Sequence, residues 1–230
     1  MLEVGVNCQK ILARIEEAAA KARRNPQEIK LLGASKTQSV EAIQAAIAAG
    51  VKLIGENYVQ EAKDKQQRIP QAVEWHMIGH LQRNKARSVV EIFGVVESLD
   101  SLALARELDK EAGKVGKTLR VLIEVNLAGE KTKSGIAKEE VTALLREAAK
   151  LAHLRIEGLM TVPPFHENVE KVRPYFRELW ELREALSGLR LPNVDLKELS
   201  MGMTHDYPVA IEEGATIVRI GTALFGPRGD

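Results

Sequence analysis

The feature that most constrains the fold of this 230-residue chain is a repeated alternation of short β-like runs with longer helical segments. The short runs are rich in apolar and β-branched residues, which is typical of strands buried in a parallel sheet. Eight strands are predicted, at residues 30–35, 51–57, 73–79, 94–100, 119–127, 155–161, 196–202 and 215–221. Because parallel strands are joined by long crossovers, usually helices, the alternation indicates an α/β protein.

Helices are predicted between these strands, and one more precedes the first strand. They span residues 4–24, 39–50, 58–69, 82–93, 101–114, 138–151, 168–186 and 205–214. Ser39 and Asp100 are expected to cap the helices that follow them, whereas Pro174 either bends its helix or marks the true start. Eight strands alternating with helices are typical of a (β/α)8 barrel, or TIM barrel, whose usual length is about 250 residues. The sequence therefore predicts a single barrel domain over residues 1–230, with an extra N-terminal helix.

An open doubly wound sheet is the main alternative to the barrel. Such a sheet usually has about six strands, and many of its members bind dinucleotides through a G-x-G-x-x-G motif after the first strand. That motif is absent after residues 30–35. The number of strands and the missing motif both favour the barrel.

The composition limits the kinds of partner that the chain recognises. A net charge of +1 and 45% apolar residues are ordinary for a globular protein, so no overall field favours nucleic acid or an anionic membrane. The basic run at residues 82–87 has no interleaved aromatic side chain to stack bases, so we interpret it as a solvated helix face. Cys8 is the only cysteine, which excludes an internal disulfide and a multi-cysteine metal site.

The chain also shows no targeting or membrane signal. No apolar run approaches the roughly 18 residues of a membrane span, and the start, with Glu3, does not resemble a secretory leader. We therefore expect a cytoplasmic monomer that binds neither nucleic acid nor a membrane, and no protein partner is identified.

Polar residues occupy the ends of the predicted strands. In a (β/α)8 barrel the C-terminal strand ends converge on one mouth, where the active site lies. The residues expected there are Ser35, Lys36, Glu56, Asn57, Gly79, His80, Glu97, Ser98, Asn126, Thr161, Ser200, Arg219, Gly221 and Thr222. Lys36 is the only lysine among them. Desolvation at an apolar rim favours the neutral amine that forms a Schiff base, whereas the alternative is a lysine that pairs with an acid or extends into solvent.

The last two strand–helix connections have the composition of a phosphate site. Barrels often bind phosphate with the loops after strands seven and eight and with a short helix. Glycines allow close backbone approach, hydroxyl groups donate hydrogen bonds, and a helix start supplies amides; the residues concerned are Gly202, Gly221, Ser200, Thr204, Thr222 and a helix beginning near His205. A phosphate site beside a Schiff-base lysine suggests pyridoxal phosphate (PLP), which carries an aldehyde and a phosphate on one small ring.

Arg219 is a candidate to face the pyridine nitrogen of such a ring, because it precedes the second of these loops. A guanidinium group cannot accept a proton, so it leaves the nitrogen unprotonated and the ring a weaker electron sink. The alternative is an arginine that pairs with a barrel carboxylate such as Glu124.

Six segments resemble the pyridoxal phosphate homeostasis protein family over essentially the whole chain. They are LLGASKTQ, GENYVQEA, WHMIGHLQRNKAR, IEVNLAGEKTKSGI, GLMTVPP and LSMGMTHDYPVAIEEGATIVRIGTALFG. The resemblance implies a fold like the N-terminal barrel of bacterial alanine racemase, called fold-type III among PLP proteins, with Lys36 holding PLP as an internal aldimine. It also implies that Ser200, Gly221 and Thr222 bind the phosphate, that Arg219 faces the pyridine nitrogen, and that the remaining cofactor contacts include Asn57, His80 and Met203.

The family resemblance implies a PLP-binding protein that contributes to vitamin B6, amino-acid and keto-acid homeostasis and that is not an enzyme with a defined reaction. A racemase needs acid–base groups on both faces of the bound substrate, and related enzymes take the second, a tyrosine, from an added β-domain. We expect no such domain here, and of Tyr58, Tyr175 and Tyr207 only Tyr58, next to Asn57, is close to the mouth. Two alternatives remain: a PLP-dependent enzyme of the alanine racemase type with an unidentified amino-acid substrate, and an aldolase-like barrel without a cofactor.

Overall fold

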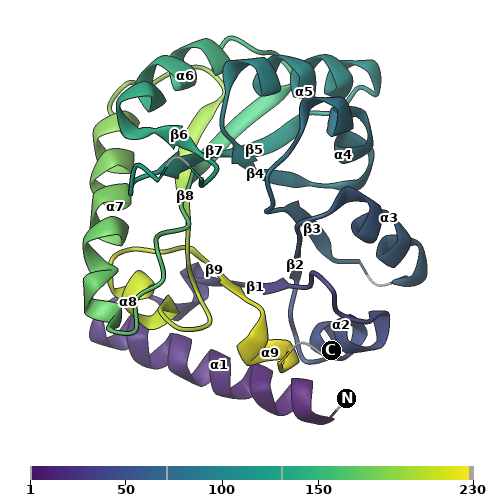
Figure 1. Cartoon of the computed structure of the whole chain (residues 1–230), viewed down its shortest axis with the longest axis vertical. Coiled ribbons are helices and arrows are strands. Elements are labelled where there is room, and N and C mark those ends of the chain that lie inside the picture. Colours follow the sequence, from purple (N-terminus) through teal and green to yellow (C-terminus); the bar gives the residue numbers. More distant parts are fainter. Residues whose placement is uncertain (1, 71, 131, 228–230) are drawn as a thin grey trace.

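The computed structural model describes residues 2–70, 72–130 and 132–227, and these form a closed ring of parallel strands surrounded by helices (Figure 1). The predicted (β/α)8 barrel is therefore confirmed. The predicted N-terminal helix is also present, as α1 (Leu2–Lys21), and it packs along the outside of the ring against α2, α8 and α9.

The barrel strands lie within a few residues of their predicted ranges. They are β1 (Lys30–Ala34), β2 (Leu53–Glu56), β3 (Glu74–Met77), β4 (Val95–Leu99), β5 (Leu119–Asn126), β7 (Leu154–Met160), β8 (Val194–Met203) and β9 (Ile217–Ile220). Around the ring their order is β4, β3, β2, β1, β9, β8, β7 and β5, and β5 pairs with β4 to close it. Because the strands are parallel, all their C-terminal ends lie on one rim, the mouth.

The helices fill the connections between strands. After α1 come α2 (Val40–Ala48), α3 (Val59–Arg68), α4 (Ala86–Ile92), α5 (Leu102–Lys114), α6 (Val141–Ala148), α7 (Arg173–Ser187), α8 (Tyr207–Glu212) and α9 (Thr222–Phe225). The main core lies between these helices and the outer face of the strands. None of the described helices combines the length and the apolar composition that crossing a lipid bilayer requires.

The interior of the ring changes character along the barrel axis. A separate apolar cluster fills it, formed by Leu32, Val95, Leu122, Met160 and Ile217. Side chains two residues apart on a strand share a face, so the next inward positions toward the mouth on β4, β5 and β9 are Glu97, Glu124 and Arg219. All three are buried. The barrel is therefore filled by apolar side chains below and by charged groups directly beneath the mouth.

The structure decides one alternative that the sequence left open, and it differs from the sequence prediction at three places. Pro174 lies in the first turn of α7, so it marks the start of the helix and does not bend it. The helix α5 is capped by Ser101, whose hydroxyl accepts from the Leu104 amide, and Asp100 is not the cap. The short strand β6 (Ile136–Ala137) and the one-turn helix α9 were not predicted, because segments this short carry no periodic pattern.

Gly158 allows β7 and β8 to approach each other closely. A methyl group at this position would lie 1.9 Å from the carbonyl oxygen of Glu198, so the two strands would have to separate. We expect Gly158→Ala to lower the free energy of unfolding by about 3 kcal/mol, as severe overpacking does. Gly5→Ala on α1, where nothing lies within 4 Å, should raise it by about 0.5–1 kcal/mol. Urea unfolding of both variants measures this, and equal stabilities would contradict the close approach.

Candidate functional site

The predicted site residues lie on, or just after, five strands that are neighbours in the ring. Those strands are β3, β2, β1, β9 and β8, and the residues are Lys36, Asn57, His80, Ser200, Met203, Arg219, Gly221 and Thr222. Ser200 and Arg219 are buried inside the barrel, whereas Lys36, Asn57, Met203 and Gly221 are half-buried at its mouth. His80 and Thr222 are exposed. The fold thus brings all eight to one side of the mouth, at two depths.

The backbone on both sides of Lys36 is held by the helix α3. The ammonium group of Lys65 donates to the Ser35 carbonyl at 2.8 Å, and the carboxylate of Glu61 accepts from the Thr37 amide at 3.0 Å. Lys65 also binds Glu56 at 2.6 Å and Glu61 at 3.0 Å, and it is buried. The turn needs this support because Thr37 has a positive φ of 65°. The contacts fix the direction in which Lys36 leaves β1.

The loop after β9 lies beside the end of β1. A methyl group added at Gly221 would lie 3.5 Å from the carbonyl oxygen of Ala34, two residues before Lys36. This loop is joined to the loop after β8, because the Ala223 amide donates to the Thr204 hydroxyl at 3.2 Å. The two loops predicted to bind phosphate therefore form one surface next to Lys36.

The helix after β8 begins differently from the sequence prediction. It begins at Tyr207, and the buried Asp206 precedes it and accepts from the Met203 amide at 2.7 Å. A carboxylate already lies at the start of α8, next to the amides that an anion would use. The helix α9 begins at Thr222, directly after the loop that follows β9.

A buried row of hydrogen bonds crosses the barrel from β3 to β9. His76 bonds Glu97 through Nδ1 at 2.6 Å and Glu74 through Nε2 at 3.0 Å. The other oxygen of Glu97 accepts from the Ser200 hydroxyl, which in turn accepts from Arg219 at 2.6 Å. The Ser200 hydroxyl, which we expect to bind phosphate, thus links a carboxylate to a guanidinium group here.

Arg219 has a second fixed contact, because its other terminal nitrogen donates to the Thr161 carbonyl at 2.8 Å. It makes no ion pair with Glu124 among the described residues, so the alternative of a direct Arg219–Glu124 pair is not what the structure shows. Burial lowers the pKa of Arg219, although Glu97 and Glu124 act in the opposite direction. A guanidinium group still remains charged there, since its ordinary pKa is above 12.

The charges along the row stabilise one another. Burial alone lowers the pKa of His76, but the hydrogen bonds to Glu74 and Glu97 outweigh it and raise the pKa above the usual range. Burial likewise raises the pKa of Glu97, and His76 and Arg219 outweigh it, so the net pKa is lowered. The hydrogen bond from His76 is the main cause that lowers the pKa of Glu74 to about 2. The row therefore contains an imidazolium, two carboxylates and a guanidinium.

Glu124 is the buried acid that the row leaves out. Its Oε2 atom is buried and has no hydrogen-bond partner among the described residues, and the same holds for the Ser98 hydroxyl on β4. Burial, together with the charge of Asp100, raises the pKa of Glu124 to about 7, against the opposite effect of Arg219. Buried polar atoms without partners are rare in proteins, so the Glu124 carboxylate indicates that a polar ligand or solvent belongs beneath the mouth.

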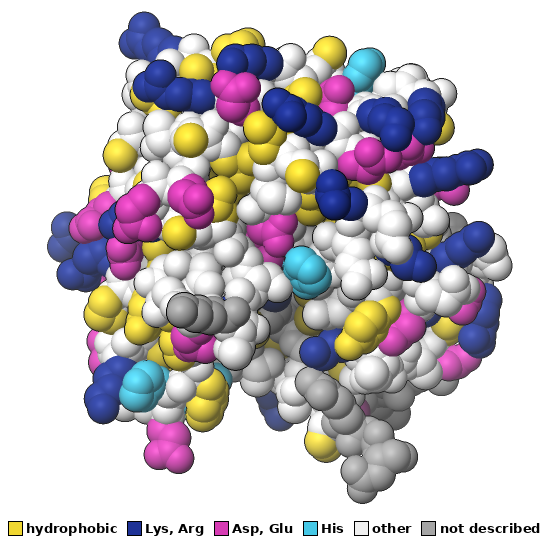
Figure 2. All heavy atoms as spheres, turned by 45° about the horizontal axis from the view of Figure 1, so that its top comes forward, with side chains coloured by type: hydrophobic (Ala, Val, Ile, Leu, Met, Phe, Trp, Pro, Cys, Tyr) yellow, Lys and Arg dark blue, Asp and Glu magenta, His cyan; other side chains and the backbone are white. Residues whose placement is uncertain are grey.

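A cavity of about 600 Å³ opens beside the mouth, between the connections that follow β2 and β3. Asn57, His80 and Tyr58 line it together. The Nδ1 atom of His80 also lies 3.4 Å from the Oδ2 atom of Asp100, and Tyr58 is largely exposed. Figure 2 shows a face of the molecule on which histidine and acidic side chains flank a central hollow, and on which charges of both signs are interspersed.

Together these groups fit the parts of a PLP molecule. An amine stands on a fixed turn, a glycine-containing loop with hydroxyl groups lies beside it, and a guanidinium group lies in the barrel below. Reasoning from the sequence did not identify Glu61, Lys65 and Asp206 as parts of the site. For Lys65 the reason is that a helical charge pattern does not tell a buried lysine from a solvated one. Glu97 was noted as a strand end and Glu124 only as a possible pairing partner.

Comparison with known proteins agrees with this arrangement. The alanine racemase N-terminal domain family matches residues 6–229 of the chain. An alanine racemase from Clostridium difficile has the same fold, with a TM-score of 0.76 at 16% identity, over 97% of this chain and 57% of the racemase. The fold and the match to the alanine racemase N-terminal domain family place the chain among the alanine racemase-like barrels.

Two nearer relatives narrow the class. The pyridoxal phosphate homeostasis protein of Aquifex aeolicus is 48% identical over 220 residues, which cover 95% of this chain and 96% of the relative. PipY of Synechococcus elongatus, solved with PLP bound, is 37% identical with a TM-score of 0.82, over 92% of this chain and 100% of PipY. The chain belongs to the pyridoxal phosphate homeostasis protein family.

The raised pKa of Glu124 predicts how stability depends on pH in the protein without ligand. An unfolded glutamate ionises near pH 4.5, whereas folded Glu124 stays protonated up to about pH 7. The folded state therefore binds the extra proton, and its stability falls as pH rises between these values. At about 1.4 kcal/mol per pH unit, the cost above pH 7 approaches about 3 kcal/mol.

Glu124→Gln removes this cost. We expect the variant to gain about 3 kcal/mol relative to the wild type between pH 4 and pH 8, measured by urea unfolding at both pH values. The exposed Glu139→Gln should gain nothing comparable. A stability difference between Glu124→Gln and wild type that is the same at both pH values would contradict the assignment.

Proposed function

We propose that this chain binds PLP at the barrel mouth through Lys36 and holds it in exchangeable form. The observation that carries the proposal is the position of Lys36, on a turn fixed by Glu61 and Lys65 and beside the Gly221 loop. The names of the family relatives and the PLP-bound structure of PipY support the choice of ligand.

Each part of the site has a role in this proposal. Lys36 would hold PLP through a Schiff base between its amine and the aldehyde, formed with release of one water, and PLP when bound supplies an electrophilic carbon and a conjugated ring that withdraws electrons. Gly221 and Thr222 bind the phosphate with backbone and hydroxyl donors, with Ser200 below them. Arg219 donates to the pyridine nitrogen and keeps it unprotonated, because a guanidinium group has no proton acceptor. Asn57, His80 and Met203 contact the rest of the ring.

We propose that the chain is not an enzyme with a defined reaction. Arg219 leaves the ring a weaker electron sink, which favours modest chemistry or none. Among the described residues, Tyr207 is buried, Tyr175 lies on α7, and Tyr58 is largely exposed in the cavity beside the mouth. The alternative remains an enzyme of the racemase type, and Tyr58 is then the candidate for the second acid.

We further propose that residues 1–230 act as one PLP-binding barrel domain. The protein works as a cytoplasmic monomer, in vitamin B6 and amino-acid homeostasis, without binding nucleic acid or a membrane.

The absorption spectrum of the purified protein tests the proposal. With added PLP, the wild type should show a visible band that borohydride removes, and Lys36→Ala should lack that band. Lys52→Ala, an exposed lysine before β2, serves as the matched control and should keep it. A wild type that stays colourless with added PLP would overturn the proposal, and a borohydride-sensitive band in Lys36→Ala would assign the bond to another lysine.

A further inference from the structure

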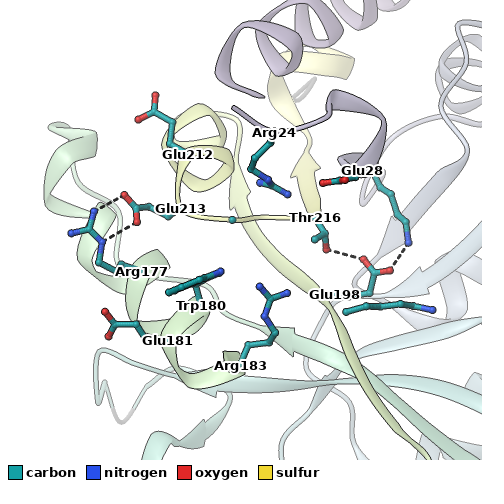
Figure 3. Close-up of a pocket in the computed structure, with 13 residues that line it drawn as sticks. Arg24, Glu28, Arg177, Trp180, Glu181, Arg183, Glu198, Glu212, Glu213 and Thr216 are labelled. Carbon is teal, nitrogen blue, oxygen red and sulfur yellow. Dashed lines mark hydrogen bonds and ion pairs between the residues drawn. The ribbon is translucent and has the colours of Figure 1, made fainter. Parts of the chain in front are cut away.

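A second cavity, of about 700 Å³, lies at the end of the barrel opposite the mouth. Its walls come from the N-terminal parts of β1, β8 and β9, from α7, and from the end of α8 (Figure 3). None of the residues that line it belongs to the candidate PLP site. The volume is in the range of sites for small molecules.

Five basic and five acidic side chains line this cavity, and two ion pairs join four of them. Lys30 binds Glu198 at 2.6 Å, and the Thr216 hydroxyl donates to the other oxygen of Glu198 at 2.7 Å. Arg177 holds Glu213 through two nitrogens, at 2.9 and 3.0 Å. These two pairs carry no net charge.

Two further guanidinium groups line the cavity, and neither pairs with another side chain of its wall. Arg24 donates from Nη1 to the carbonyl groups of Ile211 and Ala215, both at 2.8 Å, and makes no ion pair with a described residue. Arg183 forms an ion pair with Glu184, with its Nε 2.8 Å from the carboxylate, but its guanidinium group makes no hydrogen bond with a described residue. Figure 3 shows both groups directed into the cavity from opposite sides.

The two like charges disfavour each other. Burial is the main cause that lowers the pKa of Arg24, and the charge of Arg183 adds to it, whereas Glu28 acts in the opposite direction. An anion placed between the two guanidinium groups would offset both the repulsion and the lost hydration. Arginine is well suited to this role, because its planar fork binds phosphate or carboxylate with two donors.

Trp180 supplies a flat apolar surface next to these cations. The edge of its indole ring packs against Gly214, where a methyl group would lie 2.7 Å from the ring, and its side chain is nevertheless 40% exposed. In Figure 3 the ring lies beside Arg183 at the edge of the cavity. An aromatic ring of a ligand can stack on it.

We propose that this cavity binds a small phosphate that carries an aromatic ring, of the kind represented by a nucleoside monophosphate. The phosphate lies between Arg24 and Arg183, and the ring lies against Trp180. Glu28 faces the same space and opposes the anion. This site is separate from the PLP site and does not depend on the function proposed for the mouth.

Titration with adenosine monophosphate, followed by tryptophan fluorescence, tests the proposal. The chain has two tryptophans, and Trp75 is 4% exposed in the core, so a saturable change reports Trp180. We expect adenosine and inorganic phosphate each to bind at least tenfold more weakly than adenosine monophosphate. Arg183→Gln should weaken binding at least tenfold, and Glu28→Gln should tighten it several-fold.

Arg87→Gln is the matched control, since this exposed arginine on α4 lies outside the cavity and its loss changes the net charge equally. The proposal is overturned if adenosine monophosphate causes no saturable change, or if Arg183→Gln and Arg87→Gln bind it equally. If Arg183→Gln does not fold, the sign of the Glu28→Gln effect decides, because weaker or unchanged binding there contradicts an anion site.

Discussion

The buried guanidinium group of Arg219 is the constraint on which the polar interior of the barrel beneath the mouth depends. A charge taken out of water costs several kcal/mol unless other groups compensate it. Here Ser200 and the Thr161 carbonyl bind it directly, and Glu97 supplies the opposite charge through Ser200. His76 holds Glu97 in turn. Four strands thus contribute to keeping one cation beneath the mouth.

The support of Lys36 is built separately from that of Arg219. It comes from β1, β2 and α3, through Lys65, Glu56 and Glu61, whereas the row that ends at Arg219 comes from β3, β4, β8 and β9. The two systems meet because β1 and β9 are neighbours in the ring. The turn that carries Lys36 and the guanidinium group of Arg219 therefore lie at fixed positions at two depths of the barrel. Neither needs the other for its own geometry, and a ligand that spanned both would be held at two points.

The sequence predicted the barrel because local patterns define it. Buried parallel strands are apolar throughout, helices show a different period, and the strand ends follow from these two signals. Lys36 and Arg219 could be placed at the C-terminal side of the barrel for the same reason. What those residues contact could not be predicted, since Ser200 bonds Glu97 at a separation of 103 residues. The buried state of Lys65 was likewise hidden, because its helix has many charged residues and only the packing selects one of them.

In the function proposed for the mouth, the chain holds PLP, Arg219 weakens the ring as an electron sink, and the support of Lys36 fixes the point of attachment. The most direct test of this claim is the exchange of the Cα hydrogen of single amino acids with deuterium from the solvent, in the presence of protein and PLP. We predict that any exchange that depends on Lys36 is slower than enzyme-like rates, which are about 1 per second or faster. Exchange at such a rate in the wild type, lost in Lys36→Ala, would contradict the account and establish an enzyme.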